Sequence, residues 1–497
     1  MRHGIDTTDI QRIKDAYNKR PSFATKVLTP NELEIFNNLK NQRKFEYLAG
    51  RFSAKESFSK AFGTGIGSAV SFQDVEILND AHTGAPYLSK YPKKNQYQAD
   101  ITITHTDTVV TTLVVLESTK EDENMVVGYH RNTRAIIDLD AIKANIIAQK
   151  KRLKNNQEIF AVVKANAYGH GIVPVAQAAK KAGAKGFCVA IIDEGLALRN
   201  AGIKDPILIL GVNPVQEVRV MAENDLAVAV DSLEFLQAAK EILVLNHLKL
   251  KVHLALDTGM GRIGFFNPKS LKAAAEFLTA NQDYFDFEGM FTHFSTADSS
   301  DNSYFEKQVK KFDDLLKVVT PKPKYVHQAN SATALWHEPF KGNLVRMGIS
   351  MYGLNPAGTT LTSTMPLKPA FSLESEIVSV KQIEPGTSIG YGKTYTSQET
   401  EYIGTVPMGY ADGWSRKMQG FKVLVNGQYC EIVGRVCMDQ FMIRLPKKYA
   451  VGTKVTLIGE DNGKKITVDD VADYAQTINY EIVCGISSRV PRIYSER

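Results

Sequence analysis

The 497-residue sequence has few cysteines, little net charge and no long apolar run. Its four cysteines are too few and too scattered for a disulfide framework or a cysteine-rich zinc site. The N-terminal residues lack the apolar stretch of a signal peptide, and no segment approaches the ~18 apolar residues of a membrane span. The net charge of +6 is small for this length and indicates neither a nucleic-acid nor a membrane partner. These absences predict a soluble cytoplasmic protein.

At ~150 residues per domain, the length predicts about three domains. We expect a small α+β domain at residues 1–117, followed by a polar, charged linker at 118–127. Residues 128–365 alternate short β-rich runs with helix-period segments, and residues 366–497 are predicted to form a β domain. Met125, in the linker, is a candidate internal translation start.

The alternating region contains eight β-rich runs. Eight β and α units fit a (β/α)8 TIM barrel, although an open doubly wound sheet remains an alternative at this point. No Gly-x-Gly-x-x-Gly motif opens the first unit. In the last domain, Asn426-Gly427 between two strand-like runs predicts a β-hairpin. The expected barrel strands are Phe160–Val163, Phe187–Ile192, Ile207–Leu210, Ala227–Val230, Val252–Leu256, Phe287–Phe291, Tyr325–His327 and Leu344–Met347.

The first domain combines a carboxylate with a glycine-rich helix end. Thr29-Pro-Asn-Glu32 is a capping box that opens one helix, and a second helix is expected from about Glu46 to Ala61. Glu56 and Lys60 lie four residues apart in it, a spacing that on its own is typical of a surface ion pair. The glycines of Gly63–Gly67 either cap the helix or offer backbone amides to phosphate oxygens.

Together these segments resemble holo-(acyl-carrier-protein) synthase over residues 3–117. The motifs are Gly4-Ile-Asp6, Glu46–Lys60 with Gly63-Thr-Gly-Ile-Gly67, Ser71–Glu76 and Ile101–Thr106. That family of phosphopantetheinyl transferases moves 4′-phosphopantetheine from coenzyme A to acyl carrier protein with Mg2+. The resemblance implies metal ligands Asp6 and Glu56, and coenzyme contacts from Lys60, Gly63, Gly65 and His105. We expect Asp6 at the end of a first strand that is shortened, because only three residues precede Gly4.

Lys164 follows directly after the apolar run Phe160–Val163. Barrel enzymes place catalytic groups at this end of their strands. Desolvation there lowers the pKa of a lysine, and such a lysine suits a Schiff base with a carbonyl compound. The alternative is a lysine whose side chain simply reaches solvent from the strand end.

The segment Val162–Gly171 resembles the pyridoxal-phosphate signature of the alanine racemase family. That family interconverts L- and D-alanine, which supplies D-alanine for peptidoglycan, and its fold is a (β/α)8 barrel followed by a β domain. Further motifs extend the resemblance over about residues 130–497: Asp257–Gly264, Thr292–Asp298, His327–Ser331, Val345–Ile349, Ile389–Tyr395, Gly409–Gly413, Cys437–Gln440 and Ser488–Arg492.

The resemblance implies a two-base reaction in which Lys164 and Tyr391 act on opposite faces of pyridoxal 5′-phosphate. In the family the tyrosine comes from the partner subunit, so a homodimer is expected, with a higher oligomer possible through the first domain. The implied cofactor contacts are Lys164, Tyr168, His293, Ser331, Arg346, which faces the pyridine nitrogen, Gly348 and Ile349. Substrate contacts are Arg262, Tyr410 and Met438, and supporting groups behind them are His327 and Asp439.

Two positions depart from the family pattern. Ala255 stands where many relatives carry a modified lysine that orients the arginine, so an anion or a water is expected to support Arg262. Ser488 stands where some relatives have a phosphate-binding tyrosine, which predicts weaker cofactor binding. The alternatives to a fused, bifunctional enzyme are a racemase with a silent N-terminal oligomerisation appendage, a barrel decarboxylase acting on a basic amino acid, and a pyridoxal-phosphate carrier protein.

Overall fold

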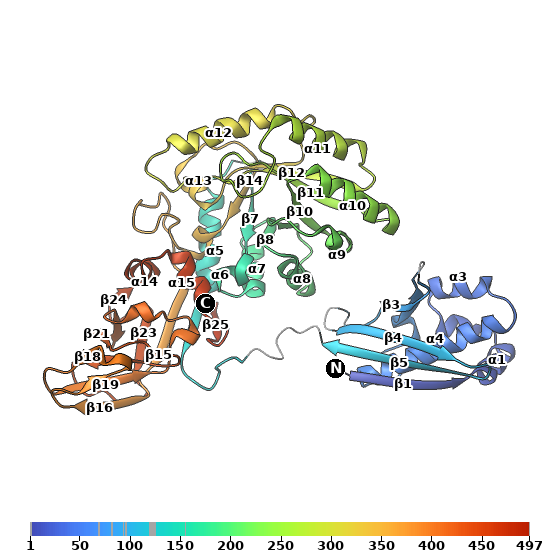
Figure 1. Cartoon of the computed structure of the whole chain (residues 1–497), viewed down its shortest axis with the longest axis horizontal. Helices are drawn as coiled ribbons and strands as arrows, with labels where there is room; N and C mark the ends of the chain where they lie inside the picture. Colours follow the sequence, from blue (N-terminus) through green and yellow to red (C-terminus); the bar gives the residue numbers. More distant parts are fainter. Residues whose placement is uncertain are drawn as a thin grey trace. The chain divides into compact units, whose positions relative to one another are not determined.

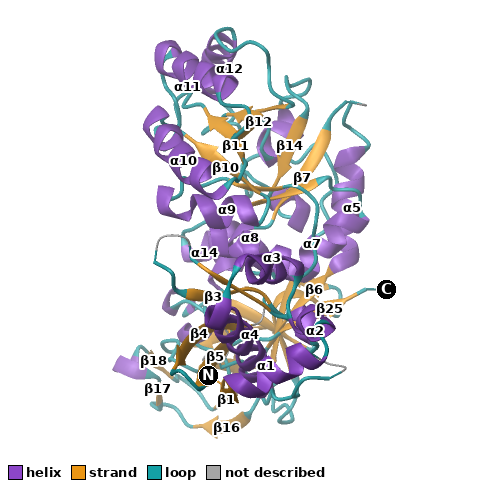
Figure 2. Cartoon of the chain, turned by 90° about the vertical axis from the view of Figure 1, so that its right-hand side faces the viewer, coloured by secondary structure: helices purple, strands orange, loops and turns teal. Residues whose placement is uncertain are grey.

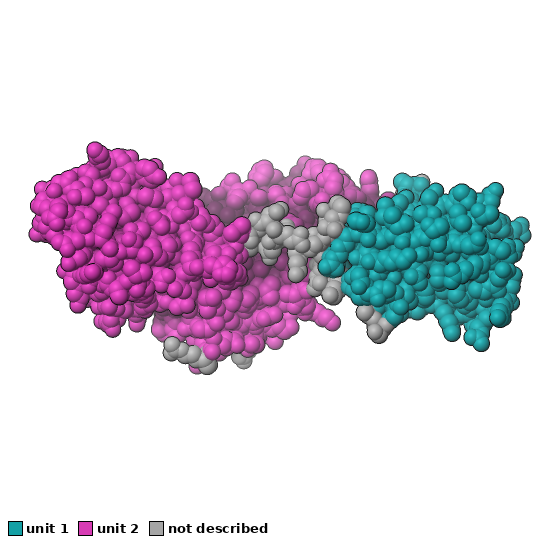
Figure 3. Space-filling model, turned by 90° about the horizontal axis from the view of Figure 1, so that it is seen from below, with its two compact units in different colours: residues 1–125 teal, residues 126–497 magenta. Residues whose placement is uncertain are grey.

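The computed structural model describes residues 2–67, 70–80, 83–92, 94, 97–118, 126–154 and 156–496. The chain divides into two compact units, residues 1–125 and 126–497, which are coloured separately in Figure 3. Residues 119–125, which include most of the predicted linker and Met125, lie outside the described residues. Within the described ranges, no helix is both long and apolar enough to cross a membrane.

The first unit packs a long helix against a small antiparallel sheet (Figure 1). Its elements are β1 (Arg2–Asp9), α1 (Ile10–Lys19), α2 (Ser22–Val27), α3 (Pro30–Asn38), α4 (Asn41–Phe62), β2 (Glu76–Asn79), β3 (Pro86–Lys90), β4 (Tyr97–His105) and β5 (Val109–Ser118). The sheet has the order β1-β5-β4, and β2 and β3 form a separate hairpin. Helix α4 packs on β1 and β5, so its inner face lies against the strand that carries Asp6.

Two of the helix ends predicted in this unit are confirmed. Thr29 and Glu32 form the capping box that begins α3, and Gly63, with φ of 87°, ends α4. However, α4 begins at Asn41 rather than near Glu46. The first turn of α4 is polar. A tertiary contact holds this end of the helix, because the Phe45 ring packs against the Tyr17 ring with 6.0 Å between the ring centroids.

The expected position of Asp6 at the end of the first strand is wrong. Strand β1 continues to Asp9 and pairs with β5 along all eight residues. The β-branched residues Thr7 and Thr8 extend it past Asp6. Gly4 allows the strand to approach α4 closely, since a Cβ there would lie 2.2 Å from the carbonyl oxygen of Ser57.

A buried lysine fixes the position of α4. Lys55 Nζ donates to Glu32 Oε2 at 2.6 Å and to the carbonyl oxygens of Val27 and Phe72 at 2.7 and 2.9 Å. Both charged side chains are fully buried, and the three ammonium hydrogens all have acceptors. Because Glu56 is the next residue, this anchor sets the rotation of α4 that turns Glu56 toward β1.

The second unit contains a parallel eight-stranded barrel surrounded by helices (Figure 2). Its elements are β7 (Glu158–Val162), α6 (Lys164–Tyr168), α7 (Ile172–Lys181), β8 (Gly186–Val189), α8 (Ile192–Asn200), β9 (Ile207–Ile209), α9 (Val218–Glu223), β10 (Leu226–Val230), α10 (Leu233–Asn246), β11 (Leu250–Ala255), α11 (Pro268–Ala280), β12 (Phe285–Phe291), α12 (Ser303–Leu316), β13 (Tyr325–His327), α13 (Ser331–Trp336) and β14 (Leu344–Met347), preceded by α5 (Leu139–Lys150).

The eight predicted runs correspond to the eight barrel strands, in the order β13-β12-β11-β10-β9-β8-β7-β14. A parallel bridge between Ala329 and Val345 joins the two ends of this sheet. The barrel prediction is therefore confirmed, and the open doubly wound alternative is excluded. Asp138 caps α5 by accepting from the backbone N–H of Ala141.

A ten-stranded sheet completes the second unit. Its elements are β6 (Arg134–Asp138), β15 (Phe371–Glu376), β16 (Ser379–Ile383), β19 (Glu401–Val406), β20 (Lys422–Val425), β21 (Gln428–Val433), β22 (Phe441–Leu445), β23 (Lys454–Asp461), β24 (Lys464–Ile466) and β25 (Arg492–Ser495), with the separate pair β17 (Ser388–Ile389) and β18 (Tyr395–Thr396) and the helices α14 (Val468–Ala475) and α15 (Asn479–Gly485). The predicted hairpin is confirmed, because Asn426 and Gly427 join β20 to β21 with φ of 48° and 71°.

Strand β6 differs from its expected assignment. Its residues fall in the range predicted as barrel, yet they pair with β15 and β25 of the ten-stranded sheet. The segment alternates exposed and buried residues, which indicates a strand but not the sheet that it joins. The two helices α14 and α15 were likewise not expected in the β domain.

We predict that Lys55→Met destabilises the first unit by about 3–5 kcal/mol, because Glu32 would stay buried without its cation. Hydrogen–deuterium exchange in α4 measures this loss. Both tryptophans, Trp336 and Trp414, belong to the second unit, so the unfolding transition seen by their fluorescence should not change. Adding Glu32→Gln should restore part of the protection, since the pair then carries no charge. Unchanged exchange in α4 of Lys55→Met would refute the anchor.

Candidate active sites

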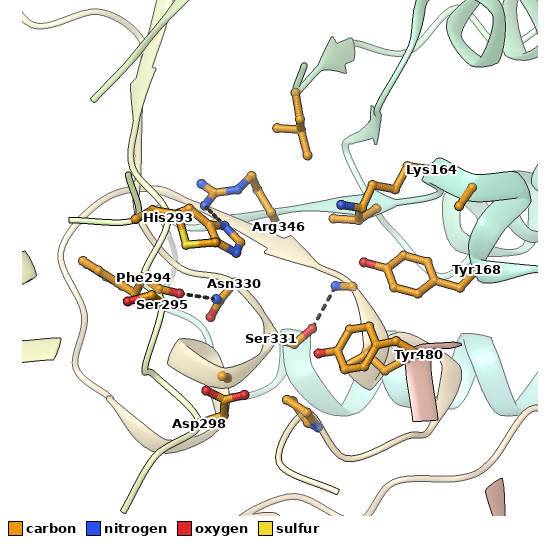
Figure 4. A pocket seen from close by; sticks show the side chains of 18 of the residues that line it. Lys164, Tyr168, His293, Phe294, Ser295, Asp298, Asn330, Ser331, Arg346 and Tyr480 are labelled. Atoms are coloured by element: carbon orange, nitrogen blue, oxygen red, sulfur yellow. Dashed lines mark hydrogen bonds between the residues drawn. The ribbon is translucent and has the colours of Figure 1, made fainter. Parts of the chain in front are cut away.

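A cavity of about 380 Å³ lies at the C-terminal ends of the barrel strands. Lys164 follows β7, His293 follows β12, and Arg346 belongs to β14. Figure 4 shows Lys164 and Arg346 extending into the same space, with Tyr168 and Ser331 beside it. All of the predicted cofactor contacts line this cavity: Lys164, Tyr168, His293, Ser331, Arg346, Gly348 and Ile349.

Lys164 begins a left-handed turn of the backbone. Residues 165–168 have φ of 51° to 54° although none is glycine. Each such residue costs about 1–2 kcal/mol, so neighbouring contacts must hold the turn. Glu194 supplies one of them, because its Oε1 accepts from the N–H of Ala165 at 2.5 Å, while its Oε2 accepts from the N–H of Ala190 at 2.8 Å next to its own helix. The turn directs both Lys164 and Tyr168 into the cavity.

The surroundings of Lys164 favour its neutral amine. Burial lowers the pKa of Lys164, the direction expected for a lysine at the end of an apolar strand, and the positive charge of Arg262 lowers it further. The negative charge of Glu194 opposes both effects. An amine with a lowered pKa is a better nucleophile and base near neutral pH.

Hydroxyl groups and a glycine form one wall of the cavity. Ser331 Oγ accepts from the N–H of Gly348 at 2.9 Å. A Cβ on Gly348 would lie 2.9 Å from the Tyr168 hydroxyl, so a side chain at this position would displace the tyrosine. Burial raises the pKa of Tyr168, which keeps its hydroxyl protonated and able to donate. These donors suit an anionic group such as a phosphate.

Arg346 forms another wall and is buried between two histidines. Its Nη1 donates to His327 Nδ1 at 2.7 Å, and its Nη2 donates to the carbonyl oxygen of Thr292 at 2.7 Å and lies 3.4 Å from His293 Nδ1. Burial lowers the pKa of Arg346 to about 10, so the guanidinium stays charged near neutral pH. Burial and the Arg346 charge lower the pKa of His293 to about 3, so that imidazole is neutral.

Sequence reasoning missed several groups at this cavity. Tyr480 and Cys484 come from α15, so the C-terminal part of the unit forms one side of the cavity. Met260, Asp298 and Asn330 lie within the motifs that were recognised, and their position in those motifs is the signal that could have found them. No local pattern marks Tyr480, because only the packing of α15 brings it to the barrel.

The predicted second base and substrate contacts do not line the cavity of their own chain. Tyr391 lies between β17 and β18 with 69% of its surface exposed, and Tyr410 and Met438 are 42% and 53% exposed. The N–H of Ala411 donates to the carbonyl oxygen of Met438 at 3.0 Å, which joins their two loops. The predicted supporting group Asp439 accepts from Arg489 at 2.8 Å.

The surroundings of Ala255 are apolar. Ala255 packs with Ala229 and Phe291, and Leu210 and Ile263 complete this cluster. These side chains cannot donate a hydrogen bond to an anion or a water at Ala255 itself. The expectation that an anion or a water supports Arg262 stays a prediction.

In the first unit, Asp6, Lys60 and Glu56 lie together. Asp6 Oδ1 accepts from Lys60 Nζ at 2.8 Å, and Oδ2 accepts from the hydroxyls of Ser53 and Thr8 at 2.8 Å each. Burial raises the pKa of Glu56, and the negative charge of Asp6 raises it further. Burial opposes ionisation of Asp6 as well, but its three hydrogen bonds hold the pKa of Asp6 below the ordinary value. Two facing carboxylates of this kind attract a cation.

The other residues predicted for this site lie elsewhere in the unit. His105 lines a different cavity with Arg43, Tyr47 and Arg51, and neither Asp6 nor Glu56 borders that cavity. Gly63 and Gly65, with φ of 87° and 66°, form the open turn after α4. No cluster of three Asp, Glu, His or Cys side chains suited to a metal occurs among the residues that the structure describes.

The two charges next to Lys164 predict opposite shifts of its pKa. Arg262→Gln removes a positive charge and should raise the pKa of Lys164, whereas Glu194→Gln removes a negative charge and should lower it. Competitive acetylation of the cofactor-free protein over a pH series, read by peptide mass spectrometry, measures the pKa of Lys164 in both variants. Labelling of the exposed Lys151 should be the same in all variants. Shifts of the same sign in the two variants would contradict this account.

Three family models match the chain. Residues 137–356 match the alanine racemase N-terminal domain, and residues 370–494 match the alanine racemase C-terminal domain. Residues 2–114 match the 4′-phosphopantetheinyl transferase superfamily.

Individual relatives agree with the two racemase models. The alanine racemase of Ligilactobacillus salivarius is 68% identical over 370 residues, which cover 74% of this chain and 100% of the relative. That of Pediococcus pentosaceus is 54% identical over 372 residues, covering 75% of this chain and 99% of the relative.

Solved structures of racemases are also similar. The alanine racemase from E. faecalis has a TM-score of 0.73 at 52% identity and covers 75% of this chain and 100% of its own. A histidine racemase from Leuconostoc mesenteroides has a TM-score of 0.71 at 35% identity, with coverage of 74% and 100%. The chain therefore belongs to the alanine racemase family and carries, in addition, an N-terminal domain that matches the 4′-phosphopantetheinyl transferase superfamily.

Proposed function

We propose that the second unit interconverts L- and D-alanine with pyridoxal 5′-phosphate and so supplies D-alanine for peptidoglycan. The observation that carries this proposal is one cavity that joins an amine of lowered pKa, a pair of hydroxyl donors and a buried arginine. The choice of alanine is supported by the relative that is 68% identical.

The cavity fits this cofactor. Tyr168, Ser331 and the backbone at Gly348 suit its phosphate, Lys164 suits its aldehyde carbon, and Arg346 suits its ring nitrogen. When bound, the cofactor supplies an electron sink that makes the α-proton of the amino acid acidic. Arg346 remains charged and cannot accept a proton, so it would leave the ring nitrogen unprotonated and limit side reactions such as transamination.

Two proton-transfer groups would act on opposite faces of the amino acid. Lys164 Nζ exchanges the proton on one face, because its lowered pKa keeps a fraction of the amine neutral. The Tyr391 hydroxyl exchanges the proton on the other face. The positive charge of Arg262 would orient the substrate carboxylate.

We propose that Tyr391 acts in the site of a partner subunit. In its own chain it projects from a hairpin with most of its surface exposed, and it does not border the Lys164 cavity. Tyr410 and Met438 are exposed on two joined loops. A two-fold dimer would let these side chains complete the partner's cavity, since each subunit offers the same two surfaces.

Mixed dimers test the shared site. Chains with Lys164→Ala and chains with Tyr391→Phe should each be inactive alone. After random reassociation, half of the dimers contain one chain of each kind and hence one intact site, so activity should return to about one quarter of the wild-type level. Alanine and histidine are both assayed, because one solved relative is a histidine racemase. No recovery in mixtures that native mass spectrometry shows to contain mixed dimers would place both bases in one chain.

We propose that the first unit transfers 4′-phosphopantetheine from coenzyme A to acyl carrier protein. The observation that carries this proposal is the pair Asp6 and Glu56, whose shared negative charge suits Mg2+. That ion would neutralise charge on the pyrophosphate during transfer. Lys60 lies beside Asp6 and can contact the same phosphates.

Intact mass of apo acyl carrier protein tests this proposal. With coenzyme A, Mg2+ and the full chain, the carrier should gain one phosphopantetheine arm. Glu56→Gln should slow the gain by at least about 100-fold, because the metal contributes several kcal/mol and loses one of two carboxylates. Glu34→Gln, an exposed residue of α3, is the charge-matched control and should not slow it. No mass gain from a chain that still racemises alanine would make the first unit a silent appendage.

A further inference from the structure

Behind Arg346, two histidines and a glutamate form a continuous hydrogen-bonded chain. Arg346 Nη1 contacts His327 Nδ1 at 2.7 Å, His327 Nε2 contacts His253 Nδ1 at 3.0 Å, and His253 Nε2 contacts Glu288 Oε2 at 3.2 Å. The four residues belong to β14, β13, β11 and β12. The chain therefore leads from the cavity wall, within four neighbouring strands of the barrel, to a carboxylate that no contact of the proposed reaction uses.

The chemistry of the four groups fixes each proton in this chain. A guanidinium only donates, so Nδ1 of His327 must be its acceptor. A neutral imidazole has one proton, which His327 then carries on Nε2 and donates to His253 Nδ1. By the same reasoning His253 carries its proton on Nε2 and donates it to the carboxylate of Glu288. The direction of every bond follows from the charge at each end.

Burial keeps the chain in this state. Both histidines are fully buried, and burial lowers the pKa of each, so they stay neutral. Burial raises the pKa of Glu288, but its hydrogen bond with His253 and nearby positive charges more than offset this, so the carboxylate is ionised. Gly289 provides the space for the ring, because a Cβ there would lie 2.2 Å from His253 Nδ1.

We propose that Glu288 and His253 are positioning residues for Arg346. They hold His327 in the one tautomer that presents a lone pair to Arg346, and this keeps the guanidinium aimed at the cavity. Without an acceptor at Glu288, His253 is free to carry its proton on Nδ1, where it would face the proton of His327. His327 would then shift its own proton to Nδ1, toward the guanidinium. The Nδ1–H of His327 and the Nη1–H of Arg346 would then face each other as two donors. Arg346 would lose the acceptor that orients it.

The inference rests in part on the proposed function, since the role of Arg346 is to face the cofactor ring. The first test of the inference does not depend on the proposed function. In cofactor-free wild-type protein labelled with 15N-histidine, the nitrogen shifts of His253 and His327 should both show a proton on Nε2. The chain has ten histidines, so the two signals can be assigned by substitution. A proton on Nδ1 of His327 would overturn the proposal, whatever the protein catalyses.

Variants of the carboxylate supply the second test. Glu288→Leu should move the His327 proton to Nδ1 and weaken pyridoxal-phosphate binding by about 10- to 100-fold, the equivalent of one hydrogen bond to a charged group. It should also raise the ratio of transamination to racemisation. Glu288→Gln should restore the tautomer and most of the affinity, because its amide oxygen still accepts from His253. Asp283→Asn, an exposed carboxylate just before the same strand, is the matched control and should change neither the tautomer nor the affinity.

His253→Phe covers the case in which Glu288→Leu fails to fold. It keeps an aromatic ring beside Tyr325, which stacks on His253 at 6.0 Å, and removes the acceptor of His327. The same tautomer shift and loss of affinity are expected. Normal tautomers and affinity in a folded Glu288→Leu or His253→Phe protein would refute the proposal. If wild-type protein binds no pyridoxal phosphate, the proposed function fails, while the tautomers still decide the positioning role.

Discussion

Burying the Arg346 guanidinium removes its hydration, and only hydrogen-bond acceptors can offset that cost. The barrel supplies them as the carbonyl oxygen of Thr292 and a lone pair of His327. Much of the site is affected by this one charge. Burial lowers the pKa of His293 and His327, and the Arg346 charge lowers both further, so both imidazoles are neutral. The Arg346 charge also fixes the direction of the hydrogen bonds that lead through His327 and His253 to Glu288.

The left-handed turn at Lys164 is a second constraint, and it is local. Non-glycine residues adopt this backbone only when other contacts hold it, and Glu194 provides one of these contacts from the next strand end. The same carboxylate also opposes the fall in the Lys164 pKa. One side chain thus affects both the position of the amine and its protonation. The strained turn that follows Lys164 directs both Lys164 and Tyr168 into one cavity.

In the first unit the buried cation is a lysine rather than an arginine. Lys55 is buried with all three hydrogens bonded, and it anchors α4 so that Glu56 faces Asp6. In both units a buried cation positions neighbouring groups. Removing Lys55 should therefore act through geometry, whereas removing Asp6 or Lys164 would act on the proposed chemistry directly.

The sequence by itself determined the secondary structure of the barrel, the hairpin at Asn426 and Gly427, and the lysine at the end of the first barrel strand. These features depend on periodicity, turn chemistry and neighbours along the chain, which a sequence displays directly. Tertiary structure decided that β6 joins the second sheet, that Tyr480 borders the cavity, and that Glu288 reaches Arg346 through two histidines. Each of these joins residues far apart in the chain, and such pairings depend on packing and burial that no local pattern encodes.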